Sequence, residues 1–193
     1  MKIAIIKYNA GNIKSVSNAL ARLGVDHTIT DNPDEINAAD KVIFPGVGEA
    51  STTMEYLKAK NLDLLIRELR QPTLGICLGM QLMCSHSEEG NTPCLGIFDL
   101  PVKKFTIDLK IPHMGWNSLH DTKTPLLDKS LEGMYVYFVH SYYVPVASET
   151  AAVTHYTVSF SAALQKDNFF ATQFHPEKSG EVGEHILKNF LHI

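Results

Sequence analysis

A cysteine flanked by two glycines is the strongest chemical signal in this sequence. The segment Gly75-Ile76-Cys77-Leu78-Gly79 follows a run typical of a strand and precedes a run typical of a helix. It is the cysteine form of the G-x-S-x-G turn, which exposes a nucleophile at the end of a strand. Cys77 would begin the helix, where free N–H groups and the helix dipole favour a thiolate. A free cysteine is often only a small buried hydrophobe, and Cys84 and Cys94, which lack this context, keep that interpretation.

A general base for such a thiol is indicated by His175-Pro176-Glu177. Pro176 disfavours helical backbone at His175, and in an extended chain residues 175 and 177 point to the same side. Glu177 could then fix the tautomer of His175, as the third group of a triad does. The alternative is a surface turn with a solvated histidine and glutamate. Together with the cysteine turn, the motif favours a base and its orienting carboxylate.

A third element is the turn Pro45-Gly46-Val47-Gly48, which directly follows a predicted strand. Backbone N–H groups of Gly46 and Val47, with that of Leu78, could stabilise an oxyanion. An ordinary strand-to-helix turn would explain the tetrapeptide equally well. With Cys77 and His175, the set indicates acyl transfer through a thioester and leaves the acyl group open.

The elements that must position these residues alternate in the first half of the chain. The apolar pattern predicts strands over 3–6, 25–30, 42–44 and 73–76, and helices over 13–23, 50–70 with a break near Asn61, and 78–86. This order predicts an α/β fold with a mostly parallel, doubly wound sheet, in which loops at the carboxyl ends of strands bind ligands. Strands over 102–105, 134–139, 151–155, 159–165 and 169–174, a hairpin turn at 166–168 and a helix over 181–191 add an antiparallel C-terminal extension.

Composition excludes several classes of function. The chain has 193 residues with 17 basic and 21 acidic side chains, a net charge of −4, and no basic block that would bind nucleic acid. No apolar run approaches a membrane span or a signal sequence. Three cysteines without a C-x-x-C pair argue against a disulfide framework and a structural zinc, and predict a reducing cytoplasm. We expect no metal and no cofactor.

The motifs G-I-C-L-G-M-Q, P-G-V-G and Q-F-H-P-E together resemble the class I (triad) glutamine amidotransferases. Within that family H-M-G-W-N at 113–117 and F-V-H-S-Y-Y at 138–143 are similar to the glutaminase subunits of imidazole glycerol phosphate synthases. The resemblance spans residues 1–193 as one type-1 amidotransferase domain of flavodoxin-like fold. It implies that Cys77 attacks the side-chain amide of L-glutamine, that His175 moves the proton and that Glu177 orients His175. It also implies substrate binding by Gly48, Gln81, Ser141 and Tyr142.

The resemblance further implies a partner, because ammonia in this family passes to a (β/α)8-barrel cyclase on a separate chain in a heterodimer. The cyclase makes imidazole glycerol phosphate and aminoimidazole carboxamide ribonucleotide in histidine biosynthesis. We predict a docking loop at 113–117 that carries Met114 and Trp116, although Trp116 could equally fill a core. Asn12, Lys178 and Tyr8 are further candidates for facing the partner. The glycines of the turn at 45–48 allow a peptide flip, so we expect the partner to accelerate glutamine hydrolysis.

Three alternatives stay open at this point. The chain could serve another amidotransferase pathway, but H-M-G-W-N and F-V-H-S-Y-Y argue against this. It could be another cysteine hydrolase, such as a γ-glutamyl hydrolase, or a chaperone-like relative of the fold. Glu177 disfavours the chaperone-like relative. It could also be a non-catalytic binding module, against which the complete set of Cys77, His175 and Glu177 argues. His140 is interpreted as structural.

Overall fold

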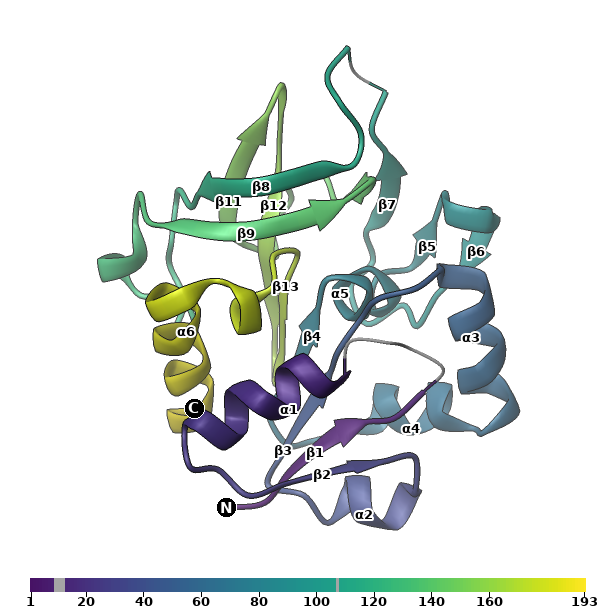
Figure 1. Ribbon diagram of the computed structural model, residues 1–193. Helices are drawn as coiled ribbons and strands as arrows, with labels where there is room; N and C mark the ends of the chain where they lie inside the picture. Colours follow the sequence, from purple (N-terminus) through teal and green to yellow (C-terminus); the bar gives the residue numbers. More distant parts are fainter. Residues whose placement is uncertain (9–12, 107) are drawn as a thin grey trace.

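The centre of the molecule is a sheet of seven strands, built from segments far apart in the sequence (Figure 1). The computed structural model describes residues 1–8, 13–106 and 108–193. Within them the strand order is β11-β12-β13-β4-β3-β1-β2; the strands from β13 to β2 are parallel, and β11, β12 and β13 are antiparallel. The sheet consists of β1 (Ile3–Ile6), β2 (His27–Thr30), β3 (Lys41–Phe44), β4 (Thr73–Ile76), β11 (Thr150–Tyr156), β12 (Val158–Lys166) and β13 (Phe169–Thr172). The predicted parallel sheet with an antiparallel extension is confirmed.

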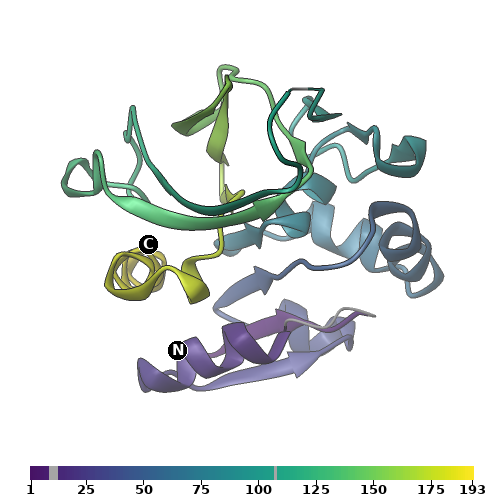
Figure 2. The ribbon, with the colours of Figure 1, turned by 45° about the horizontal axis from the view of Figure 1, so that its top comes forward.

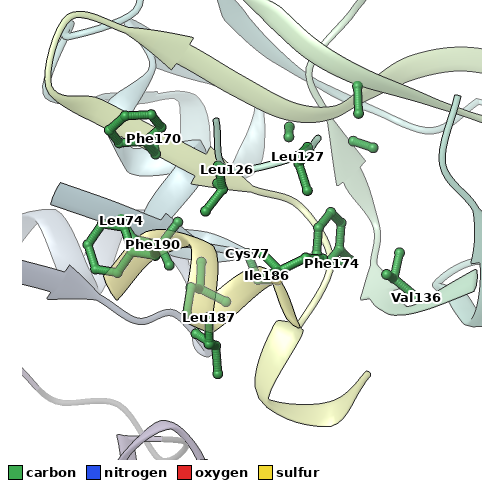
Figure 3. Close-up of a cluster of buried hydrophobic side chains, with 14 of the residues drawn as sticks. Leu74, Cys77, Leu126, Leu127, Val136, Phe170, Phe174, Ile186, Leu187 and Phe190 are labelled. Atoms are coloured by element: carbon green, nitrogen blue, oxygen red, sulfur yellow. The ribbon is translucent and has the colours of Figure 1, made fainter. Parts of the chain in front are cut away.

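Helices cover both faces of this sheet, because its central strands are apolar on both sides. Along β1, Ile3 and Ile5 enter one core cluster, while Ala4 and Ile6 enter the other. Figure 2 shows α6 (Gly180–His192) and the two-stranded ribbon of β8 (His113–Ser118) and β9 (Tyr135–His140) next to each other beside the sheet. Figure 3 shows side chains of the first cluster, among them Phe174 and Phe190. The helices are α1 (Ile13–Arg22), α2 (Pro33–Asn37), α3 (Ala50–Ala59), α4 (Leu62–Glu68), α5 (Leu78–Met83) and α6 (Gly180–His192).

Short strands and turns fill the region between β4 and β11. A ribbon of two antiparallel strands lies above the central strands in the view of Figure 1, and a small four-stranded sheet has the order β10-β7-β5-β6. These elements are β5 (His86–Ser87), η1 (Glu89–Asn91), β6 (Thr92–Pro93), β7 (Pro101–Lys104), β8 (His113–Ser118), η2 (Lys129–Leu131), β9 (Tyr135–His140), β10 (Tyr142–Tyr143) and η3 (Pro176–Lys178). The ribbon places β8 and the end of β9 close to the carboxyl end of β4.

Two predicted elements are wrong in type or length. The helix predicted over 78–86 ends at Met83, since Cys84 is extended and His86 pairs in β5. The predicted docking loop at 113–117 is strand β8, which pairs with β9 residue by residue. By contrast, the break near Asn61 is confirmed, because this residue has a left-handed φ of 54° between α3 and α4. The hairpin at 166–168 is also confirmed by the pairing of Lys166 with Phe169.

In the described part of the chain, no helix is long and apolar enough to cross a membrane.

Candidate active site

The nucleophile turn forms where β4 passes into α5. Cys77 has φ 52° and ψ −106°, a backbone conformation that side chains rarely adopt, and its N–H donates to the carbonyl of Thr172 at 2.7 Å. The flanking glycines are required by close approach: a Cβ on Gly79 would lie 2.1 Å from the Phe44 carbonyl oxygen. A Cβ on Gly75 would meet Met83 Sδ at 2.8 Å. The G-x-C-x-G pattern therefore reflects packing of the turn against β3 and α5.

The predicted base reaches the same place because β13 lies beside β4. Thr172 pairs with Ile76, so the residues that follow both strands emerge at the same edge of the sheet. His175 Nδ1 lies 2.8 Å from Glu177 Oε1, and both side chains are 1% exposed. The contact that we predicted is present, but its backbone differs. Glu177 lies in the 3-10 helix η3, so only His175 is extended, and a tight turn rather than a strand brings the carboxylate to the ring.

The electrostatics of this cluster couple His175 to Cys77. Burial alone lowers the pKa of His175, but the charge of Cys77, a hydrogen bond with Cys77 and the contact with Glu177 outweigh it and raise the pKa to about 10. Glu177 contacts Nδ1 of His175, so Nε2 is the ring nitrogen that faces away from the carboxylate. Nε2 is buried, and no atom of the described residues lies in standard hydrogen-bond geometry to it. It is therefore the atom available to exchange a proton with the thiol.

A cavity of about 340 Å³ opens at this cluster. Its lining contains all of the predicted oxyanion and substrate residues, namely Gly46, Val47, Gly48, Leu78, Gln81, Ser141 and Tyr142, together with Cys77 and His175. A larger hollow of about 500 Å³ beside β2 and α2 contains none of them. The structure thus brings together in one cavity residues that the sequence places on four separate segments.

Sequence reasoning missed Glu89, which also lines the cavity. Its Oε2 accepts from the Ala50 N–H at 2.8 Å. Burial is the main cause that raises the pKa of Glu89, the nearby Glu49 adds to it, and the bond from Ala50 opposes it. Glu89 stands in the polar run Glu88-Glu89-Gly90, which is typical of a surface turn, so no local pattern marks it. Its carboxyl group adds an acidic side chain to the cavity lining.

Tyr8 does not face a partner, contrary to our prediction. Its side chain is buried at 4% exposure and packs edge-on against Phe44. Its hydroxyl donates to the Pro45 carbonyl, so it supports the turn that carries Gly46 and Val47. Burial raises the pKa of Tyr8, and the nearby Cys77 raises it further. Tyr8 therefore belongs to the core that supports the turn at 45–48.

The other residues predicted to face a partner lie at the surface. Met114 and Trp116 are 56% and 55% exposed on the same face of β8, which excludes a core-filling role for Trp116. Lys178 is exposed on η3. The residue after it, Ser179, accepts a hydrogen bond from the Tyr137 N–H, and Tyr137 pairs with Trp116 across the strands β9 and β8. Asn12 lies outside the described residues. Met114 and Trp116 make an exposed apolar face on β8. This face begins two residues after Pro112, which lines the cavity.

His140 lines the cavity too and is held by a second histidine. Its Nδ1 donates to the Tyr142 carbonyl at 2.7 Å, so its Nε2 accepts from His113 Nδ1 at 3.0 Å. Burial lowers the pKa of His140 to about 3, although the Tyr142 carbonyl opposes the shift and His113 and His175 add to it. Burial likewise lowers the pKa of His113 to about 4. Both rings are therefore neutral, and the structural interpretation of His140 fits these contacts.

We expect the free energy of unfolding to fall as the pH is lowered from 6.5 to 5. The unfolded chain takes up protons on His113 and His140 near pH 6.5, whereas the folded protein stays neutral there until pH 4 or 3. Each histidine contributes a slope of up to about 1.4 kcal/mol per pH unit. His175 behaves oppositely: its raised pKa adds stability below pH 6.5 that is lost as the pH rises toward 10. Urea unfolding midpoints at pH 7, 6 and 5 measure the effect.

The variant His140→Asn separates this histidine from other groups, because the asparagine keeps an N–H donor for the Tyr142 carbonyl. Between pH 6.5 and 5, the slope of its free energy of unfolding against pH should be smaller by up to about 1.4 kcal/mol per pH unit, which corresponds to one proton. The same substitution at His155, an exposed residue of β11, is the matched control. An unchanged slope in His140→Asn would contradict the assignment.

Comparisons with known proteins are consistent with this site. The family model described as Glutamine amidotransferase class-I matches residues 4–193. The chain belongs to the class-I glutamine amidotransferase family. This amidotransferase is 63% identical over 196 residues to imidazole glycerol phosphate synthase subunit HisH of Bacteroides fragilis strain YCH46 and 47% identical over 197 residues to that of Pectobacterium atrosepticum, with 100% of each chain covered. Within the family it therefore groups with the HisH subunits, and the resemblance found in its motifs is confirmed.

Solved structures support the fold of the amidotransferase. It superposes on a crystal structure of glutamine amidotransferase with a TM-score of 0.75 at 17% identity, covering 98% of this chain and 97% of the other. It also superposes on PurLQS from Thermotoga maritima with a TM-score of 0.72 at 15% identity, covering 99% and 97%. At these identities the likeness concerns the fold alone.

Proposed function

We propose that this amidotransferase hydrolyses L-glutamine through a Cys77 thioester and delivers the ammonia to the cyclase of an imidazole glycerol phosphate synthase. The observation that carries the chemistry is the meeting of Cys77 and His175 in one cavity, with Glu177 on the other ring nitrogen of His175. The HisH relatives, similar over the full length, support the pathway. The whole chain, 1–193, acts as one amidotransferase domain.

The proton and the acyl group move between three side chains. His175 Nε2 takes the thiol proton, and Cys77 Sγ attacks the side-chain amide carbon of glutamine. The tetrahedral intermediate collapses as His175 returns the proton to the leaving nitrogen, which departs as ammonia. Water, deprotonated by His175, then cleaves the γ-glutamyl thioester and releases glutamate. Glu177 keeps Nδ1 protonated and Nε2 aimed at the sulfur throughout.

The cavity wall supplies the remaining interactions from the backbone and a few side chains. N–H groups of Gly46, Val47 and Leu78 stabilise the oxyanion. Glu89 and Gln81, which both line the cavity, are the side chains that suit the α-ammonium of glutamine. Both N–H bonds of the Gln81 amide are already used, toward the Tyr142 carbonyl and Gln173 Oε1, each at 3.0 Å. What Gln81 offers a ligand is consequently its carbonyl oxygen, which suits an ammonium. This mechanism needs no metal and no cofactor.

The partner is a (β/α)8-barrel cyclase subunit that joins this chain in a heterodimer. The exposed apolar face of Met114 and Trp116 on β8 is suited to a permanent contact, because aromatic residues at such faces dominate binding energy. Since β8 starts beside the cavity, a partner on this face would close over the place where ammonia forms. The cyclase would then use ammonia to make imidazole glycerol phosphate and aminoimidazole carboxamide ribonucleotide. The free cysteines suit a reducing cytoplasm.

Glutamate release should be slow in the free subunit and faster when the cyclase and its ligand are added. Trp116→Ala should weaken binding of the cyclase about 30-fold, since a central interface tryptophan contributes 2 kcal/mol or more. Isothermal titration of the two subunits and a steady-state glutamate assay measure these effects. Leu64→Ala is the control, because Leu64 is also 55% exposed but lies on α4.

Two outcomes would count against this function. Equal rates of glutamate release with and without the cyclase would reject activation by the partner. Binding of Trp116→Ala within twofold of the unchanged chain would reject β8 as the docking strand.

A further inference from the structure

Gln173 is a buried polar residue that lies against the nucleophile and has no part in the mechanism above. It follows β13 directly, and Cys77 follows the neighbouring parallel strand β4. The pairing of Thr172 with Ile76 places these two residues side by side. Gln173 is 0% exposed, and its Nε2 donates to Cys77 Sγ at 3.6 Å. A fully buried amide aimed at a reactive sulfur calls for an explanation.

The direction of this amide follows from a neighbour that cannot turn. The Tyr142 carbonyl only accepts hydrogen bonds, so the atom of Gln81 that meets it must be Nε2. The same Nε2 meets Gln173 at 3.0 Å, so the atom of Gln173 there must be the acceptor Oε1. The N–H group of Gln173 is thereby left to face Cys77. The opposite orientation would set donor against donor at Gln81.

The position of Tyr142 is itself secured by a second donor. His140 Nδ1 donates to the same carbonyl at 2.7 Å, and His140 is held in turn by His113. The amide of Gln173 is thus oriented by a row of buried groups that contains no freely rotating hydroxyl. Preorganised donors of this kind act on developing charge without having to reorient.

We propose that Gln173 is a further catalytic residue, which donates to the sulfur of Cys77, and that Gln81 positions it. A donor to sulfur favours the thiolate over the neutral thiol, and over the thioester sulfur, which accepts hydrogen bonds poorly. Gln173 therefore assists twice: when the thiolate attacks the amide carbon, and when it leaves the thioester as water attacks. In the resting thiol, Cys77 points its S–H toward the Val139 carbonyl at 3.8 Å. The inference rests on the proposed function for its consequence in catalysis, but not for the contact with the thiol.

Alkylation by iodoacetamide tests the contact without any glutaminase assay. The rate at Cys77 is followed by peptide mass spectrometry from pH 5 to 9. In Gln173→Leu it should fall about tenfold or more at pH 7, since a hydrogen bond to a charged group is lost. In Gln173→Glu, which places a carboxylate against the sulfur, the pH profile should also move to higher pH. Gln165→Leu and Gln165→Glu are matched controls on β12, outside the cavity lining.

The results separate a chemical from a structural role. Buried Cys84 should stay unreactive if the variants fold. In the glutaminase assay Gln173→Leu should lower kcat more than it raises KM, because Gln173 contacts the sulfur directly and the substrate only through Gln81. Folded Gln173 variants that alkylate like the unchanged protein at every pH would overturn the proposal. If neither variant folds, Gln81→Leu provides the test, because it frees the Gln173 amide to rotate. Alkylation of Cys77 at the wild-type rate in Gln81→Leu overturns the proposal, and slower alkylation supports it. If the unchanged protein has no glutaminase activity but its Gln173 variants show these changes in alkylation, the proposed function is rejected and the contact between Gln173 and Cys77 is retained.

Discussion

Cys77→Ala should abolish glutamine hydrolysis while leaving the use of free ammonia intact. With the nucleophile removed, no thioester can form, and a loss of roughly 10⁴-fold or more in kcat is expected. Ammonia bypasses this chain and reaches the cyclase directly, so imidazole glycerol phosphate formation from ammonium salts should continue in the complex. The measurement compares product formation with glutamine and with ammonium chloride, with the cyclase present in both.

The same substitution at Cys94, a half-buried cysteine outside the cavity lining, is the control and should keep both activities. Glutamine-dependent synthesis by Cys77→Ala above the background without this chain would contradict the thioester mechanism. Because the ammonia-dependent reaction does not pass through this chain, its loss would indicate a fault in the cyclase rather than an effect of removing the nucleophile.

Gly79→Ala should destabilise the fold and disable the site together. The added Cβ would lie 2.1 Å from the Phe44 carbonyl oxygen, which is backbone and cannot move aside. Relief requires α5 to separate from the turn that follows β3, and overpacking of this kind costs about 3 kcal/mol or more. We expect the melting temperature to drop by roughly 6–12 °C. The remaining folded protein should have a much lower kcat, because Leu78 and Gly46 move apart.

Gly96→Ala is an informative control for this prediction. Gly96 has φ +69° with nothing within 4 Å of an added Cβ, so alanine there meets backbone strain without a clash. Its cost should be about 1–2 kcal/mol, with kcat unchanged. Equal effects of the two substitutions on stability, or full activity in Gly79→Ala, would show that close packing of the nucleophile turn is unimportant.

Local chemistry explains which parts of the site were predictable from the sequence. Gly75, Cys77 and Gly79 express a steric rule within five residues, and His175 and Glu177 are two residues apart, so both motifs carry their own evidence. Glu89 belongs to no motif, and Gln173 belongs to Q-F-H-P-E without any indication there of its role, because both roles depend on neighbours that only the folded chain supplies. Gln173 is held by Gln81 of α5, which in turn donates to the Tyr142 carbonyl in β10, and no spacing in the sequence connects these residues.

The errors in the fold have a similar origin. Residues 113–117 contain a glycine and end in a polar residue, so they resemble a loop; pairing with the strongly apolar β9 makes them a strand. The pattern that suggested a helix to residue 86 continues past Met83, but the chain turns there because Ser85 and Cys94 join in backbone hydrogen bonding and His86 enters a sheet. Long-range pairing outweighs local propensity in both cases.

The place of β13 in the sheet has a consequence for how the chain is made. This strand is translated after both β4 and β12, yet it fills the gap between them in the middle of the sheet. Until it emerges, the nascent chain exposes β4 as an apolar edge that invites aggregation. His175 follows directly after the same strand, so a chain that ends before β13 contains the nucleophile Cys77 without its base.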